Sequence, residues 1–245
     1  MDYVSGYTIC NDVSERAWQL EHGTTPQNDI SGNGAHLQYA DGTNLLRNVK
    51  ALQASTSTTA STTDFSVANH SLFGGSGLPD YNGEWSLSFW VNIPSNGTSF
   101  DTILGEHDDS STVKHFKIYQ MSGNLSFSMA FQNNALDLSV PFTTYNTWKH
   151  VVMTKASGEP TTTTVKVYID GVAQTVTATY NDDAPARGSA ENWSSTSSSI
   201  RFFGHSWSYT SAGSFAGVRT GRVFKLDQVA GYSKELSSSE VTQIY

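Results

Sequence analysis

The chain has little cysteine, little positive charge and no long apolar segment. Its single cysteine, Cys10, rules out an intramolecular disulfide framework, and we interpret it as a small buried side chain. Only 14 of the 245 residues are Lys or Arg. They are scattered along the chain, whereas binding nucleic acid requires clustered basic side chains. No apolar run approaches the length of a membrane span, and no signal peptide is visible at the N-terminus. We therefore expect neither a nucleic-acid partner nor a membrane span.

Hydroxyl side chains and acidic side chains are plentiful instead. The chain contains 34 Ser and 27 Thr, and its formal net charge is −8. Thr suits the half-exposed surface of a β-sheet, so this composition is typical of an all-β protein with hydroxyl-rich outer faces. It is also common among extracellular proteins. The excess of carboxylates is compatible with calcium sites, although simple solubility is the commoner reason for it.

Apolar and polar residues alternate along most of the chain, which predicts β-strands. In WSLSFWVNI (85–93) the odd-numbered residues share one face, and Trp90 lies among the polar residues of the other. The stretch TVKVYIDG (164–171) ends in Asp170-Gly171, a strong signal for a two-residue hairpin turn. Similar patterns predict further strands at 16–21, 101–106, 115–120, 124–131, 148–155, 199–205 and 223–232.

One helix is expected, at the C-terminus. Ser237 is followed three residues later by Glu240, which is the pattern of a capping box. Two Ser/Thr-rich segments, 53–65 and 191–200, are interpreted as long loops or exposed edge strands, because the alternation resumes directly after each. The whole chain, 1–245, is therefore predicted to form a single domain, a sandwich or jelly roll.

Four stretches, taken in order, resemble one known family. They are NDISGNGAHLQY (28–39), WSLSFWVNI (85–93), NTWKHVVMTKASG to TVKVYIDGV (146–172) and LDQVAGYSKELSSSEVTQIY (226–245). Together they are similar to the laminin-G-like branch of the concanavalin A-like lectin/glucanase superfamily. The resemblance implies an all-β, two-sheet antiparallel jelly-roll sandwich with one short C-terminal helix.

The resemblance also implies a structural calcium ion. In many members of the family, calcium joins an N-terminal turn to an acid of the C-terminal strand. Carried over to this chain, the ligands would be Asp29, Asn33 and Asp227. Oxygen ligands of this kind suit calcium. The alternative is that Asp227, which lies among apolar residues, accepts hydrogen bonds from backbone N–H groups or pairs with a basic side chain.

The catalytic motifs of related enzymes are missing. Glucanases of this fold use Glu-x-Asp-x-x-Glu, and alginate lyases use Arg-rich and Gln-x-His strands; neither pattern occurs here. The cluster formed by Glu106, Asp108 and Asp109 is expected to lie in a loop after a strand, as a solvated turn or a cation site. We therefore expect a domain without catalytic residues.

Sugar binding is the favoured function, because sugars stack on exposed aromatic rings. Trp207 and Tyr209 alternate in GHSWSYTSAGSF (204–215) and form the first candidate site, with Trp193 and Tyr81 as further candidates. Each ring could instead fold back onto the edge of the sandwich.

The leading hypothesis is a lectin-like domain that recognises a polysaccharide or a glycosylated surface, located outside cells or on a particle. The alternatives are a structural or adhesive subunit of a phage, virus or other assembly, in which case an oligomer is expected, and a glycoside hydrolase or polysaccharide lyase.

Overall fold

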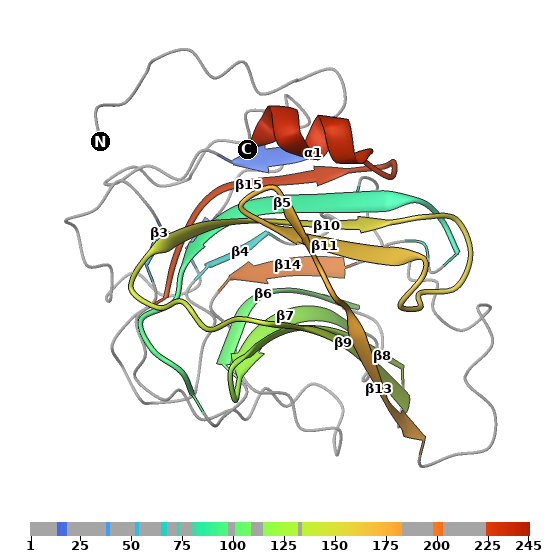
Figure 1. Cartoon of the computed structure of the whole chain (residues 1–245), viewed down its shortest axis with the longest axis horizontal. Coiled ribbons are helices and arrows are strands. Elements are labelled where there is room, and N and C mark those ends of the chain that lie inside the picture. The colour runs from blue at the N-terminus through green and yellow to red at the C-terminus, as the bar shows by residue number, and fades with distance from the viewer. Residues whose placement is uncertain are drawn as a thin grey trace.

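The computed structural model describes residues 14–18, 38–39, 52–53, 65–67, 73, 80, 82–97, 101–108, 115–131, 134–182, 198–202 and 224–245. These residues form two antiparallel sheets and one helix, which confirms the predicted sandwich (Figure 1). No helix among them is long and apolar enough to cross a membrane.

The first sheet has seven strands in the order β1-β15-β5-β10-β11-β12, with β3 also paired to β15. Its strands are β1 (Ser14–Trp18), β3 (Leu52–Gln53), β5 (Trp85–Asn92), β10 (Trp148–Lys155), β11 (Val165–Ile169), β12 (Val172–Gln174) and β15 (Lys225–Tyr232).

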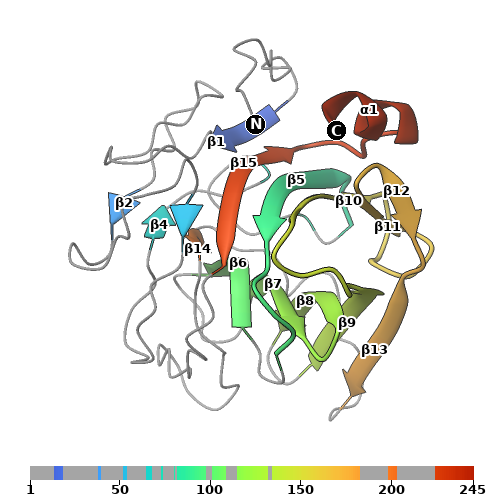
Figure 2. The same ribbon diagram turned by 60° about the vertical axis from the view of Figure 1, so that its left-hand side comes forward.

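The second sheet has eight strands in the order β13-β9-β8-β7-β6-β14-β4-β2. Its strands are β2 (Gln38–Tyr39), β4 (Phe65–Val67), β6 (Asp101–Asp108), β7 (His115–Met121), β8 (Asn124–Phe131), β9 (Asn134–Pro141), β13 (Thr177–Asp182) and β14 (Ser198–Phe202). Figure 2 shows the chain passing from β12 of one sheet to β13 of the other.

The main core lies between the two sheets. The odd-numbered residues of β5 point into it, as the alternation predicts, and meet the apolar residues of β7, β8 and β9 from the other side. Among the largest buried side chains are Trp85, Phe89, Phe116 and Phe127. The even-numbered residues of β5, including Trp90, lie on the outer face of the first sheet.

The helix α1 (Ser238–Ile244) covers part of that outer face (Figure 1). It begins with the predicted capping box: the Ser237 side chain accepts a hydrogen bond from the Glu240 backbone N–H, and the Glu240 carboxylate accepts one from the Ser237 backbone N–H. A second apolar cluster holds the helix against the sheet. Its buried members are Val152, Tyr168, Ala230, Tyr232, Leu236 and Val241.

The turn at Asp170-Gly171 has the expected backbone. Both residues have positive φ angles, 52° and 74°, as a type I′ hairpin turn requires. The turn joins β11 to β12, and Ile169 pairs directly with Val172.

Two expectations need correction. The strand predicted at 199–205 is confirmed as β14, which pairs with β6 on one side and β4 on the other, so the end of the segment 191–200 belongs to an interior strand rather than to a loop or an edge. Glu106 and Asp108 lie within β6 rather than in a loop after it. Strands β9 and β13 were not among the predicted strands, although Leu136, Leu138 and Val140 of β9 alternate with polar residues and β13 contains two Thr and one Tyr.

Candidate ligand-binding face

The outer face of the second sheet carries a row of polar residues. Lys117 of β7 pairs with Ser128 of β8, and Ser128 pairs with Asp137 of β9. Because residues directly opposite one another in a sheet share a face, these three side chains lie side by side. Their neighbours along the strands, such as Phe116 and Phe127, point into the core instead. Figure 1 shows β6 to β9 bending so that this outer face is the inner side of the bend.

Two polar atoms in this row are buried and find no partner in the part of the chain that the structure describes. Neither the Ser128 hydroxyl oxygen nor Oδ1 of Asp137 has a hydrogen-bond partner among the described residues. Native proteins satisfy nearly all such groups, so an exception calls for a reason such as a binding role or ordered water. The row therefore contains one donor–acceptor hydroxyl and one carboxylate oxygen that no described residue satisfies.

Lys117 supplies a cation to the same row. It is only 3% exposed, and its ammonium lies 5.3 Å from the centre of the Tyr119 ring, within the range of a cation–π contact. Burial lowers the pKa of Lys117 to about 8, and the neighbouring Asp137 carboxylate offsets part of that effect. The face thus combines a carboxylate, a hydroxyl, an aromatic ring and an amine.

Gly105 of β6 lies beside Lys117 and adds no side chain to the row. It pairs with Lys117 on one side and with Arg201 of β14 on the other. A Cβ atom at Gly105 would lie 3.2 Å from the carbonyl oxygen of Phe116 and 3.5 Å from Cβ of Lys117. A larger residue would therefore crowd the row from the β6 side.

A second polar row runs alongside the first. Tyr119, Ser126, Ser139 and Thr177 are in register on β7, β8, β9 and β13. The hydroxyl groups of Ser139 and Thr177 are 2.9 Å apart and form a hydrogen bond. Hydroxyl groups and amides are the partners that polar sugars require, so the chemistry of this face suits a polyhydroxylated ligand.

The acidic cluster that was expected to form a solvated turn or a cation site does not form an accessible pair of carboxylates in the described residues. Glu106 is completely buried and pairs with Phe116, a residue of the main core. A carboxylate in that position faces the interior of the sandwich. The side chain of Asp108, and Asp109 altogether, lie outside the described residues.

The predicted sugar-binding residues Trp207, Tyr209, Trp193 and Tyr81 all lie outside the described residues, as do the predicted calcium ligands Asp29 and Asn33. Sequence reasoning overlooked Lys117, Ser128 and Asp137. The signal was available in part, because Lys117 interrupts the apolar residues Phe116 and Ile118 at an outward position. Which residues of β8 and β9 lie beside it depends on strand register.

Asp227, the third predicted calcium ligand, lies on the outer face of the first sheet. It is half-buried in β15, pairs with Trp90 of β5, and accepts a 2.8 Å hydrogen bond from the Gln228 backbone N–H. This bond matches the alternative raised by the sequence. No group of three or more His, Cys, Asp or Glu residues among the described ones could hold a metal ion, so the described residues alone do not supply a calcium site.

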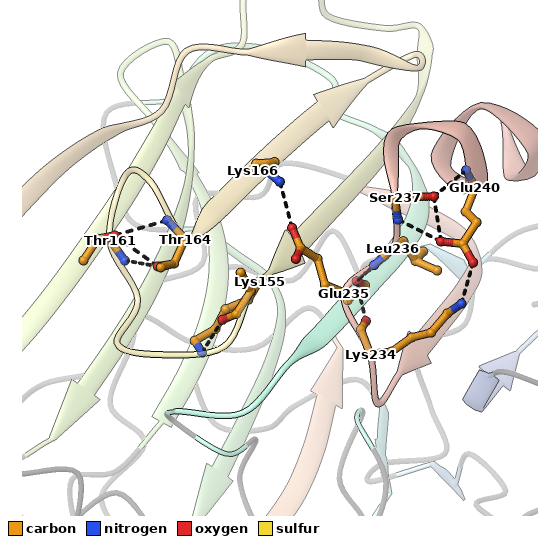
Figure 3. A network of polar contacts seen from close by, with 11 residues as sticks. Lys155, Thr161, Thr164, Lys166, Lys234, Glu235, Leu236, Ser237 and Glu240 are labelled. Carbon is orange, nitrogen blue, oxygen red and sulfur yellow. Dashed lines mark hydrogen bonds and ion pairs between the residues drawn. The ribbon is translucent and has the colours of Figure 1, made fainter.

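A network of polar contacts ties the loops of the first sheet together (Figure 3). The Lys155 ammonium donates to the carbonyl oxygens of Gly83, Ala156 and Gly158 at 2.6, 3.1 and 2.7 Å. Near α1, Lys166 pairs with Glu235 at 2.8 Å, and Lys234 pairs with Glu240. The charged groups of this region therefore stabilise the loops and the start of α1.

Comparison with known proteins agrees with the sandwich fold. The model of the family described as "Concanavalin A-like lectin/glucanases superfamily" matches residues 62–242. A comparison with curated protein sequences finds no match.

Among solved structures, the binding domain of botulinum neurotoxin serotype D/C VPI 5993 is similar, with a TM-score of 0.62, 17% identity and coverage of 96% of this chain and 52% of that one. The binding domain of Paraclostridial Mosquitocidal Protein 1 has a TM-score of 0.54 and 16% identity, and the match covers 96% of this chain and 52% of that one. The ligand-binding domain of botulinum neurotoxin serotype D, in complex with N-acetylneuraminic acid, has a TM-score of 0.54 and 16% identity. That match covers 96% of this chain and 51% of the other. The chain thus spans about half the length of these structures.

Proposed function

Since the chain belongs to the concanavalin A-like lectin/glucanase superfamily, we propose that it is a non-catalytic carbohydrate-binding domain that recognises a polysaccharide or a glycosylated surface. The observation that carries the proposal is the row Lys117, Ser128 and Asp137 on the outer face of the second sheet. It holds polar groups that are buried and, in two cases, without a partner among the described residues. Burying such groups is unfavourable unless a partner satisfies them.

The similar structures support the proposal at the level of the fold. They are described as binding domains, and one was solved with a sialic acid. Since the chain spans about half of each, their ligands are properties of those longer proteins. A role outside cells or on a particle surface fits this comparison and remains part of the proposal.

The experiment is binding of the chain to a glycan array, followed by calorimetric titration with the strongest ligands. Ser128→Ala and Asp137→Asn remove one polar atom each from the row and are expected to weaken binding at least tenfold. The matched control is Thr154→Val, because the Thr154 hydroxyl is also buried without a partner among the described residues but belongs to the first sheet.

No binding to any glycan at millimolar concentration would overturn the proposal. Binding that is unchanged in Ser128→Ala and Asp137→Asn but lost in Trp207→Ala or Tyr209→Ala would instead assign the sugar to the aromatic loop predicted from the sequence.

The structural calcium remains a prediction that rests on the resemblance and on Asp227. If calcium binds, Asp29 and Asn33 must complete the ligand set with backbone carbonyl groups. A calcium ion bound only to the native state would raise the stability by about 2.7 kcal/mol at a hundredfold excess over Kd. Thermal unfolding with calcium and with EDTA should then differ for the wild type and coincide for Asp227→Asn. Identical curves for the wild type would leave Asp227 as a hydrogen-bond acceptor alone.

A further inference from the structure

The C-terminal segment is held by its own apolar cluster, separate from the main core. The cluster under α1 lies on the outer face of the first sheet, and the main core lies on the opposite face. The helix has only seven residues, and so short a helix is unstable without tertiary packing. Segment 234–245 can therefore detach without exposing the residues between the two sheets.

His150 of β10 lies beneath the end of this segment. Its side chain is buried, with the ring centroid 5.1 Å from that of Trp90 and 5.8 Å from that of Tyr245. The Tyr245 ring also stacks on Trp90 at 6.1 Å. Tyr245 itself is 49% exposed, so it is an outer cover over His150 and Trp90. Its ring also lies beside the hairpin turn, since a Cβ atom added at Gly171 would lie 3.4 Å from it.

The hydrogen bonds of His150 suit a neutral ring. Nε2 is 2.8 Å from the Ser88 hydroxyl, while Nδ1 is buried and has no hydrogen-bond partner among the described residues. A neutral imidazole has one N–H group, and the Ser88 hydroxyl can accept its hydrogen bond. A protonated imidazole has two N–H groups, so one of them would be buried without an acceptor.

The charged groups around His150 offset this penalty only in part. The nearest is Asp170, in the turn between β11 and β12, whose carboxylate accepts hydrogen bonds from the His150 backbone N–H at 3.0 Å and from Lys149 at 2.5 Å. Asp227 of β15 is in register with Trp90, which separates it from His150. On the α1 segment, Glu240 is paired with Lys234 and Ser237 near the start of the helix.

We propose that His150 is an acid-sensitive latch: protonation of its ring releases Tyr245 and helix α1 from the outer face of the first sheet. The protonated ring gains water only if the Tyr245 cover opens. Opening that cover removes the stacking contacts at the C-terminal end of α1. The segment then depends on the capping box and on the apolar contacts of Val241 and Leu236.

The pH range in which the latch opens follows from the direction in which the pKa of His150 is shifted. Burial lowers the pKa of His150 to about 4 from its ordinary value of 6.5, and Asp170 raises it in part. The closed form therefore binds fewer protons than the open form between these values, so closure is favoured above about pH 6.5 and weakens as the pH falls towards 4. The opening equilibrium should rise by up to about tenfold per pH unit in this window.

Backbone amide exchange, measured residue by residue by NMR from pH 7.5 to pH 4.5 and corrected for intrinsic rates, tests the latch. Amides of 236–244 should lose protection as the pH falls, while amides of β8 keep theirs. In His150→Gln, whose amide side chain can still reach Ser88 but does not titrate, protection of 236–244 should not change with pH.

A second variant keeps the test decisive if His150→Gln folds poorly. Tyr245→Ala removes only the half-exposed cover, and the pKa of His150, read from its ring resonances, should rise from about 4 towards 6.5. An unchanged pKa in Tyr245→Ala would overturn the proposal. So would unchanged protection of 236–244 in the wild type at pH 4.5, or simultaneous loss of protection in β8.

Discussion

Lys155 illustrates, at the scale of a single residue, how a buried charge is accommodated in this fold. It is the last residue of β10 and is completely buried. Its three ammonium hydrogen bonds go to carbonyl oxygens in the loop before β5 and the loop after β10. Burial lowers the pKa of Lys155 to about 8, and the carboxylates of Asp80 and Glu84 raise it in part. The Lys155 side chain therefore links the two loops, a role called a tie below, and its ammonium is not a free amine.

Lys155→Met should destabilise the domain by about 2–4 kcal/mol, because three carbonyl groups lose their donor while the new side chain cannot replace it. Urea unfolding followed by circular dichroism measures the loss. Lys166→Met is the matched control, since the Lys166 side chain is 53% exposed in its pair with Glu235. Exposed pairs contribute less than about 1 kcal/mol. Equal losses in the two variants would contradict the assignment of Lys155 as a tie.

At the scale of the element, α1 is stabilised both by a local capping box and by a hydrogen bond to a distant strand. The capping box satisfies N–H groups at the helix start, and the Ser86 hydroxyl of β5 accepts a 2.9 Å hydrogen bond from the Leu236 backbone N–H just before it. Hydrogen bonds from Lys234 and Ser237 lower the pKa of Glu240 to about 2. The carboxylate therefore keeps its role in the box at pH values above about 4.5, and loses it as the pH falls towards 2.

Ser237→Ala should weaken the helix by about 1 kcal/mol, because the side chain that caps the helix is lost. Amide exchange of 239–244 should then accelerate about fivefold at pH 7. Ser238→Ala serves as the control, because Ser238 is the first residue of the helix, is exposed, and does not provide the cap. If both variants exchange alike, the cap does not stabilise α1.

At the scale of the whole molecule, the first sheet separates two apolar clusters of unequal importance. The larger cluster lies between the sheets and includes Phe127 of β8; the smaller one lies under α1 and includes Val241. Because the larger cluster joins both sheets, its loss affects the entire domain. The smaller one joins only the helix and its preceding turn to one sheet.

Phe127→Ala should lower the free energy of unfolding by about 3–5 kcal/mol and reduce amide protection in both sheets. Val241→Ala removes a smaller apolar group and should raise exchange in 236–244 while β8 stays protected. The two exchange profiles, measured side by side, distinguish the clusters. A uniform change in Val241→Ala would mean that helix and sandwich unfold as one unit.

Much of the fold could be predicted from the sequence because it depends on local patterns. The patterns in 85–93, 124–131 and 148–155 identify strands β5, β8 and β10, and the alternation in 85–93 and 124–131 also identifies the face that turns inward. The turn at Asp170-Gly171 and the cap at Ser237 depend on residue types at fixed spacing, so both are legible in the sequence. Each of these features involves residues close together in the chain.

The candidate binding face could not be predicted in the same way. Lys117, Ser128 and Asp137 come from three strands, and only the pairing register places them in one row. Glu106 was expected in a loop, but its register opposite Phe116 places it against the core. A shift of one residue would turn each of these side chains to the opposite face.

The sequence by itself therefore determined the β-rich sandwich, its inward faces, the hairpin turn and the capped C-terminal helix, because these depend on periodicity and local backbone preferences. Tertiary structure alone decided that Trp90, His150 and Tyr245 stack on the outer face of the first sheet, and that a lysine, a serine and an aspartate meet on the second. The physical reason is that both arrangements join residues distant in the chain, whose meeting depends on strand order, register and packing.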